Sequence, residues 1–458
     1  MRAGTHRILP VAALVVAIAA LTVALIRGVG FITLDRTPAY FAIEGVCWTL
    51  FAAAVLLLLR VPRRAAPAVV LLGTVLLGAA GASGPPNIST DSARYNWDGI
   101  VQDAGVSPYR FVPADAALAP LRPAWLFPAG ATAADGTLTC PGPLKLPVEQ
   151  IGAAGTVCTA INRPTVPTIY PPVAEALFAA ARIAVPADAQ YLPTQLLGLL
   201  AVLGTTALLL RTLRSAGRDP RLAAVFGWCP FVVTEAVTNA HIDAWAALLA
   251  LAATVLISRG RQGWGGVVLG LAIATKFLPV LVVPPLGRRR PWLIGLTAIG
   301  TVALVYVPHV LAVGPSVIGY LPGYLNEEGY DSGSRSALLS AVLPDAASTP
   351  AALILLAVLA VVLLIRSDPA DPWAAQTVMV GSALLILSPA YGWYSLLLVP
   401  FIVMSGRWEW FAVVIGLSLI GVHHDLPIMR SVLVVVLAMV VLSALLRRRL
   451  RSPDLGAA

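Results

Sequence analysis

The chain has 458 residues, of which 58% are hydrophobic and only 12% are charged. Soluble domains carry about 25% charged residues, so this composition excludes a soluble globular protein and indicates a polytopic membrane protein. The formal net charge of +9 does not indicate a nucleic-acid partner, because the arginines gather in short runs beside apolar segments. Such runs set the orientation of a membrane protein next to anionic headgroups, so the expected partner is the lipid bilayer.

Apolar segments of roughly 20 residues or somewhat fewer predict about twelve membrane crossings. Arg2 and Arg7 place the N-terminus in the cytoplasm, and the basic run at Arg447–Arg451 places the C-terminus there too. The first apolar run has no clear cleavage site, which favours a retained helix in the plasma membrane. The predicted crossings are 8–26, 39–59, 66–82, 191–210, 222–238, 244–257, 291–311, 351–365, 373–387, 395–404, 412–422 and 429–446.

Two apolar segments do not fit this alternation. Residues 263–286 have arginines on both sides and carry Lys276 and Pro279 near their middle, which favours a re-entrant pair of half-helices. Residues 171–185 are predicted to rest at the outer membrane surface. The chain therefore divides into a three-helix segment (1–82), an extracytoplasmic loop with surface helices (83–190) and a multi-helix region (191–458).

The loop opens with residues 90–99, where two carboxylates, an arginine and aromatics are crowded together. If a helix starts at Thr90 or Asp91, then Asp91, Arg94 and Asp98 share one face with Tyr95. Asp91 is either a simple N-cap or a positioned general base for a hydroxyl nucleophile. We favour the general base because the other polar groups stand beside it at a membrane boundary.

Cysteine and metal patterns are sparse. Cys140 and Cys158 lie in the outer loop, where a disulfide between them is permitted, whereas Cys47 and Cys229 fall in apolar helices. The sequence has no metal-binding or nucleotide-binding motif, and no cofactor is predicted with certainty. A divalent cation stays open as a possibility, with candidate ligands Asp91, Asp98, His241 and Asp243.

The loop motifs resemble a known family. The pattern Asp91-x-x-Arg94-Tyr95-x-Trp97-Asp98-Gly99, followed by Gly105-x-x-Pro108-Tyr109 and by Tyr170-Pro171-Pro172, resembles the first extracytoplasmic loop of GT-C glycosyltransferases. Among these, the chain resembles the actinobacterial α-mannosyltransferases of glycosyltransferase family 87, which use polyprenyl-phosphate sugars. Further matches are 239–243, 274–279 and 387–394. The cysteine-containing stretch 127–157 and Ile242 depart from the pattern.

The resemblance implies an all-α, GT-C-like fold and an inverting transfer of a sugar, with mannose favoured, from a polyprenyl-phosphate donor to an extracytoplasmic glycolipid or lipid-linked glycan. Asp91 is then the general base, and Asp98 supports it by positioning the acceptor or by orienting Arg94. The candidate donor-phosphate ligands are Lys276, Arg94, Arg335 and His423. The candidate sugar or acceptor contacts are Tyr95, Trp97, Tyr109, Tyr170, His241, Asp243, Trp393 and Tyr394.

Two other classes of protein stay open at this stage. A transporter or flippase for a lipid-linked or polar substrate shares the polytopic architecture and the broken helices. Transporters usually repeat their hydropathy pattern, and the first 190 residues here have no counterpart later in the chain. A non-catalytic scaffold is disfavoured by the clustered acidic and aromatic residues of the loop.

Overall fold

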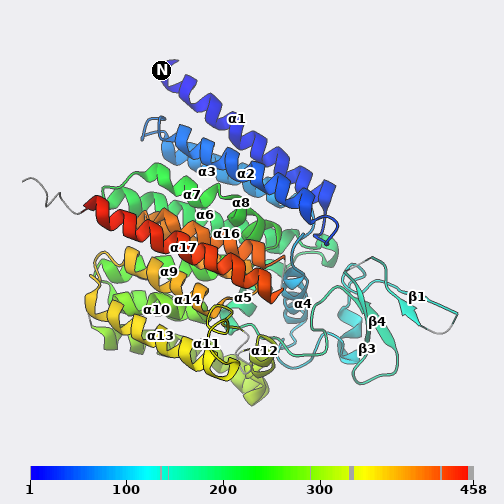
Figure 1. Ribbon diagram of the computed structural model, residues 1–458. Helices are drawn as coiled ribbons and strands as arrows, with labels where there is room; N and C mark the ends of the chain where they lie inside the picture. The colour runs from blue at the N-terminus through cyan, green and yellow to red at the C-terminus, as the bar shows by residue number, and fades with distance from the viewer. Residues whose placement is uncertain are drawn as a thin grey trace, which may run out of the picture.

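The computed structural model describes residues 2–134, 137–142, 144–288, 290–329, 335–422 and 425–451. Its helices lie side by side in one bundle, and the segment from α4 to α5, which carries all the strands, lies at one end of the bundle (Figure 1). The start of α1 and the end of α17 lie at the opposite end. An even number of passes through the bundle therefore separates the two ends of the chain.

The N-terminal segment is a layer of three helices, α1 (Arg2–Ala24), α2 (Thr37–Leu58) and α3 (Ala66–Gly81). A π-helical turn, Leu25–Val29, continues α1. Their mostly apolar sequences favour helix because an apolar segment in a membrane satisfies its backbone hydrogen bonds locally, and α1 tolerates Pro10 in its interior. They present apolar side chains on every face, as helices between lipid and protein do.

The loop contains α4 (Asp91–Asp103), a 3₁₀ turn η2 (Ala116–Leu121) and α5 (Pro172–Arg182). It also contains two small antiparallel hairpins, which the sequence did not predict. They pair β1 (Ala131–Thr132) with β2 (Leu138–Thr139), and β3 (Leu146–Glu149) with β4 (Thr156–Thr159).

The helices α4 and α5 pack unusually closely at Gly99. A Cβ atom at this position would lie 2.4 Å from the carbonyl oxygen of Phe178, so only glycine fits. The close packing places α5 directly behind the helix that begins with Asp91.

The rest of the chain is helical. Its α-helices are α6 (Leu192–Ser215), α7 (Ala224–Gly227), α8 (Pro230–Val232), α9 (Asp243–Ser258), α10 (Gln262–Ile273), α11 (Pro291–Val313), α12 (Leu321–Glu327), α13 (Asp345–Arg366), α14 (Trp373–Leu387), α15 (Leu398–Ser405), α16 (Phe411–Ile420) and α17 (Leu426–Arg451). The π-helix η5 (Val233–Thr238) follows α8, and the 3₁₀ helix η9 (Gly392–Leu397) precedes α15.

Among the described residues, 6 helices are long and apolar enough to cross a membrane, and 7 if a pair bent by 52° around residues 228–229 counts as one span. The remaining predicted crossings coincide with apolar helices of 10–17 residues. A polytopic membrane protein is thus confirmed, whereas the number of twelve crossings stays a prediction.

Arginine side chains join the interhelical loops at the end of the bundle where α1 starts and α17 ends. Arg7 donates to the carbonyl oxygen of Arg60 at 3.1 Å, and Arg221 donates to that of Val61 at 2.8 Å. Arg63 lies 3.7 Å from Asp219. The predicted cytoplasmic loops therefore lie together, although the side of the membrane that they face stays a prediction.

The segment 263–286, which is predicted to be a re-entrant pair, folds back on itself. Arg261 and Arg290, which flank it, line one groove, so its two ends lie together. Its tip reaches the outer loop, where the backbone N–H of Val173 donates to the carbonyl oxygen of Ala274 at 3.0 Å. The returning half is built from two short 3₁₀ helices, Leu278–Val282 and Pro284–Leu286, because the prolines disfavour an α-helix there.

Candidate active site

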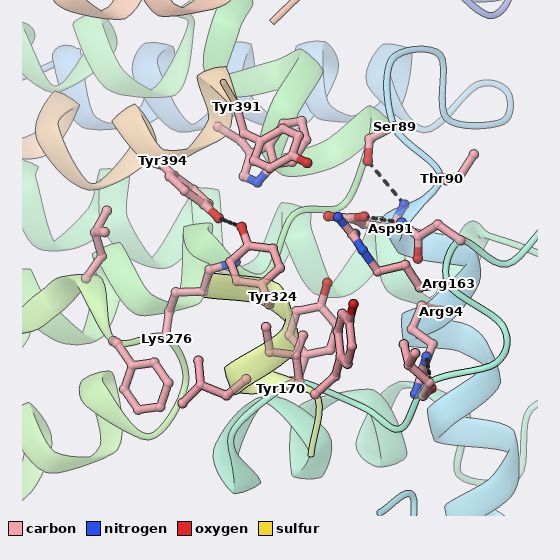
Figure 2. A pocket seen from close by; sticks show the side chains of 18 of the residues that line it. Ser89, Thr90, Asp91, Arg94, Arg163, Tyr170, Lys276, Tyr324, Tyr391 and Tyr394 are labelled. Atoms are coloured by element: carbon pink, nitrogen blue, oxygen red, sulfur yellow. Dashed lines mark hydrogen bonds between the residues drawn. The ribbon is translucent and has the colours of Figure 1, made fainter. Parts of the chain in front are cut away.

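A cavity of ≈ 410 Å³ lies where the outer loop, the tip of the re-entrant segment, α12 and η9 meet (Figure 2). This volume is in the range of pockets that bind small molecules. Its polar and aromatic lining residues are Phe31, Ser89, Thr90, Asp91, Arg94, Asn162, Arg163, Tyr170, Lys276, Phe277, Tyr320, Tyr324, Arg335, Tyr391, Trp393 and Tyr394.

The turn that leads into α4 is held by a buried asparagine. The Oδ1 atom of Asn239 accepts from the backbone N–H groups of Asn87 and Ile88 at 3.0 Å each, and the backbone N–H of Asp91 donates to the Oγ of Ser89 at 3.1 Å. Asn239 lies next to η5, so a residue about 150 positions away fixes where α4 begins. The first residue of the helix is Asp91, and its N-cap position is Thr90.

The Asp91 side chain is anchored on one side and open on the other. The Nδ2 of Asn162 donates to Oδ1 at 2.6 Å, and Oδ2 lies 4.0 Å from the Nδ1 of His241. The side chain is 16% exposed, and it lines the cavity. A fixed, accessible carboxylate of this kind can take a proton from a bound hydroxyl.

Asp98 does not line the cavity. It is buried, and its two carboxylate oxygens accept from the Nε of Arg94 at 2.9 and 3.0 Å. Arg94 lines the cavity and also donates to the carbonyl oxygen of Val166 at 3.2 Å. The structure therefore places Asp98 where it orients Arg94, one of its two predicted roles, and away from an acceptor in the cavity.

Behind this pair lies Glu175, which the sequence analysis did not consider. It is fully buried, and it accepts from the hydroxyl of Thr168 at 2.7 Å and from the Nε2 of Gln102 at 2.9 Å. Burial and the nearby Asp98 carboxylate raise the pKa of Glu175 well above its usual range, while burial also raises the pKa of Asp98 against the opposing effect of Arg94. The raised pKa favours the protonated form of Glu175, whose hydrogen bond from Gln102 supports α4 from α5.

Lys276 is the cation at the tip of the re-entrant segment. Its Nζ lies 3.3 Å from the Oδ2 of Asp243, and it lies over the rings of Tyr394 and Tyr170 at 5.1 and 5.7 Å. Asp243 is buried, whereas Lys276 lines the cavity. Asp243 thus holds the lysine in place rather than facing a ligand itself.

Two arginines add positive charge to the same cavity. Arg163, which the sequence analysis overlooked, lies 2.6 Å from Glu327 and stacks over the ring of Tyr324 at 5.6 Å. Arg335, a predicted phosphate ligand, is paired with Glu328 and lines the cavity. His423, the fourth predicted phosphate ligand, lies outside the described residues.

Among the predicted aromatic contacts, Tyr170, Trp393 and Tyr394 line the cavity. Tyr394 shares a hydrogen bond with Tyr324 of α12, whose side chain also faces the cavity (Figure 2). Aromatic faces of this kind suit the apolar faces of a sugar ring, and their hydroxyls suit its polar edge.

The other three predicted aromatics lie in the core of the loop. Tyr95 is fully buried and stacks on Phe178 with ring centroids 4.4 Å apart. Trp97 packs against Phe127 at 4.9 Å. Tyr109 donates its hydroxyl to the carbonyl oxygen of Tyr170 at 2.6 Å, so it shapes the cavity wall from behind.

The sequence motif 239–243 also lies behind the cavity wall. The His241 side chain is 0% exposed, with Nε2 at 3.2 Å from the Oε2 of Glu235. The four residues considered as metal ligands are not gathered, because Asp98 pairs with Arg94 and Asp243 pairs with Lys276. Within the described ranges, no group of three or more His, Cys, Asp or Glu side chains is arranged to hold a metal ion.

Cys140 and Cys158 form a disulfide with their Cα atoms 5.5 Å apart. Cys158 belongs to β4, and Cys140 directly follows β2, so the bond joins the two hairpins. Cys47 and Cys229 are free and buried.

Residues 168–389 match the family Glycosyltransferase family 87. This match confirms the predicted resemblance and indicates a glycosyltransferase. It includes Lys276, Asp243 and Arg335 but not Asp91. Comparison with curated proteins gave no match, and comparison with solved structures gave none either.

Proposed function

We propose that this chain, a glycosyltransferase by its family match, moves a sugar from a polyprenyl-phosphate donor to an extracytoplasmic glycolipid or lipid-linked glycan, with inversion at the anomeric carbon. One observation carries the proposal. The cavity combines an accessible, anchored carboxylate, Asp91, with a set of cations that includes Lys276, Arg163 and Arg335. A base and a phosphate-binding set are the two parts that such a transfer needs.

In the proposed mechanism, Asp91 takes the proton of an acceptor hydroxyl as its oxygen attacks the anomeric carbon. The bond between that carbon and the phosphate oxygen breaks, and the phosphate leaves with the electron pair. Lys276 and the two arginines stabilise the negative charge that develops on the phosphate. Because attack and departure occur on opposite faces of the sugar, one displacement inverts the configuration.

A lipid-linked donor is supported by a second cavity of ≈ 250 Å³ that adjoins the first. The two cavities share Ile88, Trp393 and Gly421 in their walls. The second is lined mostly by apolar side chains of α2, α8 and α16, and an isoprenoid chain matches that chemistry. Its apolar lining residues include Phe41, Trp48, Phe231, Ile415, Leu419 and Val422.

The direct test uses the purified full-length protein in detergent with a defined polyprenyl-phosphomannose and a glycolipid acceptor. We expect transfer of mannose, with inverted configuration at the new linkage, and no transfer from a nucleotide-activated mannose. Retention of configuration, or use of the nucleotide sugar alone, would contradict the proposed mechanism. Mannose is the sugar that the family resemblance favours, so arabinofuranose and glucose donors serve as comparisons.

We also propose that the cavity faces the extracytoplasmic side of the plasma membrane. Ala133 is exposed at the loop end of the bundle, and Arg288 is exposed beside the basic groove at the other end. An impermeant thiol reagent added to intact cells is expected to label Ala133→Cys but not Arg288→Cys. The two free native cysteines are buried, so their background should be low. Labelling of Arg288→Cys from outside would reverse the orientation.

A further inference from the structure

We propose that the base of the transfer is not Asp91 alone but a line of three side chains, Asp91, His241 and Glu235. In this line His241 receives the proton from Asp91, and Glu235 is a positioning residue that holds the imidazole and its charge. The inference rests on the proposed function of the cavity. Its basis is that the two ring nitrogens of His241 lie 4.0 Å from Asp91 and 3.2 Å from Glu235.

The ring of His241 is fixed by its surroundings. It stacks on Trp393 with centroids 4.0 Å apart and planes at 13°. The backbone N–H of His241 donates to the carbonyl oxygen of Glu235 at 2.9 Å, across a residue, Ala240, with a φ of 56°. A left-handed non-glycine residue is uncommon and needs support from its surroundings. The chain thus turns sharply to aim both ring edges at carboxylates.

The line runs from one cavity to the other. Asp91 lines the first cavity and Glu235 lines the second, while the His241 side chain is 0% exposed between them. A ligand in the first cavity can therefore contact Asp91 but not His241 itself. The other titratable groups around the line include Tyr95 and Tyr170 beside Asp91, Asp243 and Lys276, which are paired with each other near the first cavity, and Glu44 and Tyr40 of α2 at the second.

The chemistry favours this arrangement over a lone aspartate. A carboxylate with an ordinary pKa of about 3.9 is a weak base near neutral pH, whereas imidazole has an ordinary pKa of about 6.5. Imidazolium donates from both nitrogens, and carboxylates only accept, so a proton that arrives at His241 finds an acceptor on each side. The O–H bond of the acceptor breaks and its proton passes to Asp91, while the oxygen keeps the electron pair for its bond to the anomeric carbon. Asp91 then closes the 4.0 Å gap to Nδ1, directly or through one water, and the proton passes to His241.

The test is the pH dependence of kcat/KM for polyprenyl-phosphomannose in the full-length protein. Glu235→Gln removes a negative charge that stabilises the proton on His241. We expect its plateau to fall about 10-fold and its acid limb to move to lower pH, because the line becomes a weaker base. The acid limb is the diagnostic readout and KM for the donor is not, since Glu235 lines the second cavity, which is proposed to hold the isoprenoid chain. Glu235→Asp should return the acid limb toward that of the wild type.

Two further variants separate this role from a structural one. His241→Asn keeps an amide donor near Asp91 but cannot take up a proton, so kcat should fall about 100-fold. Glu409→Gln is the matched control, because Glu409 is a buried glutamate paired with Arg447. It lies just before α16, away from the end of that helix that lines the second cavity, so the pH profile should not change.

If Asp91→Asn abolishes activity but Glu235→Gln leaves it intact at every pH, the three-residue inference is wrong and the proposed function still stands. A Glu235→Gln loss with an unshifted acid limb also overturns the inference, because that pattern indicates a merely structural residue. If the wild-type protein transfers no sugar from any polyprenyl-phosphate donor, the proposed function fails, and the inference fails with it.

Discussion

The first turn of α4 and its middle turns carry the same kinds of side chains but meet opposite surroundings. Asp91 is partly exposed to the cavity, and its contacts come from Asn162 and His241, far along the chain. Asp98 is buried against α5, and it contacts Arg94 of its own helix. The difference teaches that one helix face can serve two purposes, because a neighbouring helix covers only part of its length.

The same contrast separates charges that can act on a ligand from charges that hold others in place. Asp91 and Lys276 line the cavity, whereas Asp98 and Asp243 are buried partners of cavity-lining cations. Buried ion pairs contribute little net stability, but removing one partner leaves the other charge buried and unpaired, which is strongly destabilising. Mutations in the two sets should therefore differ in whether activity or stability falls first.

The largest effect is expected at Asp91. Asp91→Asn keeps the shape and the hydrogen bond that the backbone N–H of residue 91 donates to Ser89, but it removes the base, so kcat should fall by about 10²–10⁴-fold. The thermal unfolding midpoint should change little. Asp103→Asn, an exposed aspartate at the other end of α4, is the matched control and should keep full activity. Near-normal turnover by Asp91→Asn would remove the assignment of the base to this position.

Lys276→Gln should lower kcat by about 100-fold, since one charged donor to the developing phosphate charge is lost. It should also lower the unfolding midpoint, because Asp243 is left buried and unpaired. The double variant Lys276→Gln/Asp243→Asn separates the two effects. It should recover stability but not activity, and recovery of both would show that Lys276 acts only as a structural partner.

Asp98→Asn should affect stability more than activity. The buried Arg94 loses its charged partner, at a cost of about 3–5 kcal/mol in the free energy of unfolding. Activity of the folded fraction should fall only about 10-fold, because Arg94 loses its orientation while the base stays intact. The measurement is kcat at one temperature for the folded fraction of the purified variant. If the variant is stable but inactive, Asp98 rather than Asp91 is the base.

The smallest effect on activity is expected at Glu175. Its folded-state pKa is raised, so folded protein binds a proton that unfolded protein loses above pH of about 4.3. The stability that this bound proton gives the folded protein is fully present below that pH. The free energy of unfolding then falls by about 1.4 kcal/mol per pH unit as the pH rises toward the folded-state pKa. Glu175→Gln should thus be relatively more stable at pH 8 than at pH 5.5, as measured by thermal unfolding. An equal stability difference from wild type at both pH values would contradict a protonated Glu175.

Some features of this protein follow from the sequence alone. Continuous apolar runs and flanking arginines predict helices at every proposed crossing, because an apolar segment satisfies its backbone hydrogen bonds locally. The crowding of charges after the third helix indicated Asp91, and the interruption by Lys276 and Pro279 indicated a turn inside the bundle. Each of these signals lies within a window of a few tens of residues.

Only the tertiary structure decided which polar side chains share the cavity. Helical spacing placed Asp91, Arg94, Tyr95 and Asp98 on one face, but it could not show that α5 covers most of that face. Arg163 and Glu175 carried no local signal, since their importance comes from partners on other elements. His241 was predicted as a sugar or acceptor contact, yet its place beside Asp91 depends on a contact between residues 150 positions apart. Such contacts are set by how helices pack, and the order of residues along one helix does not contain that information.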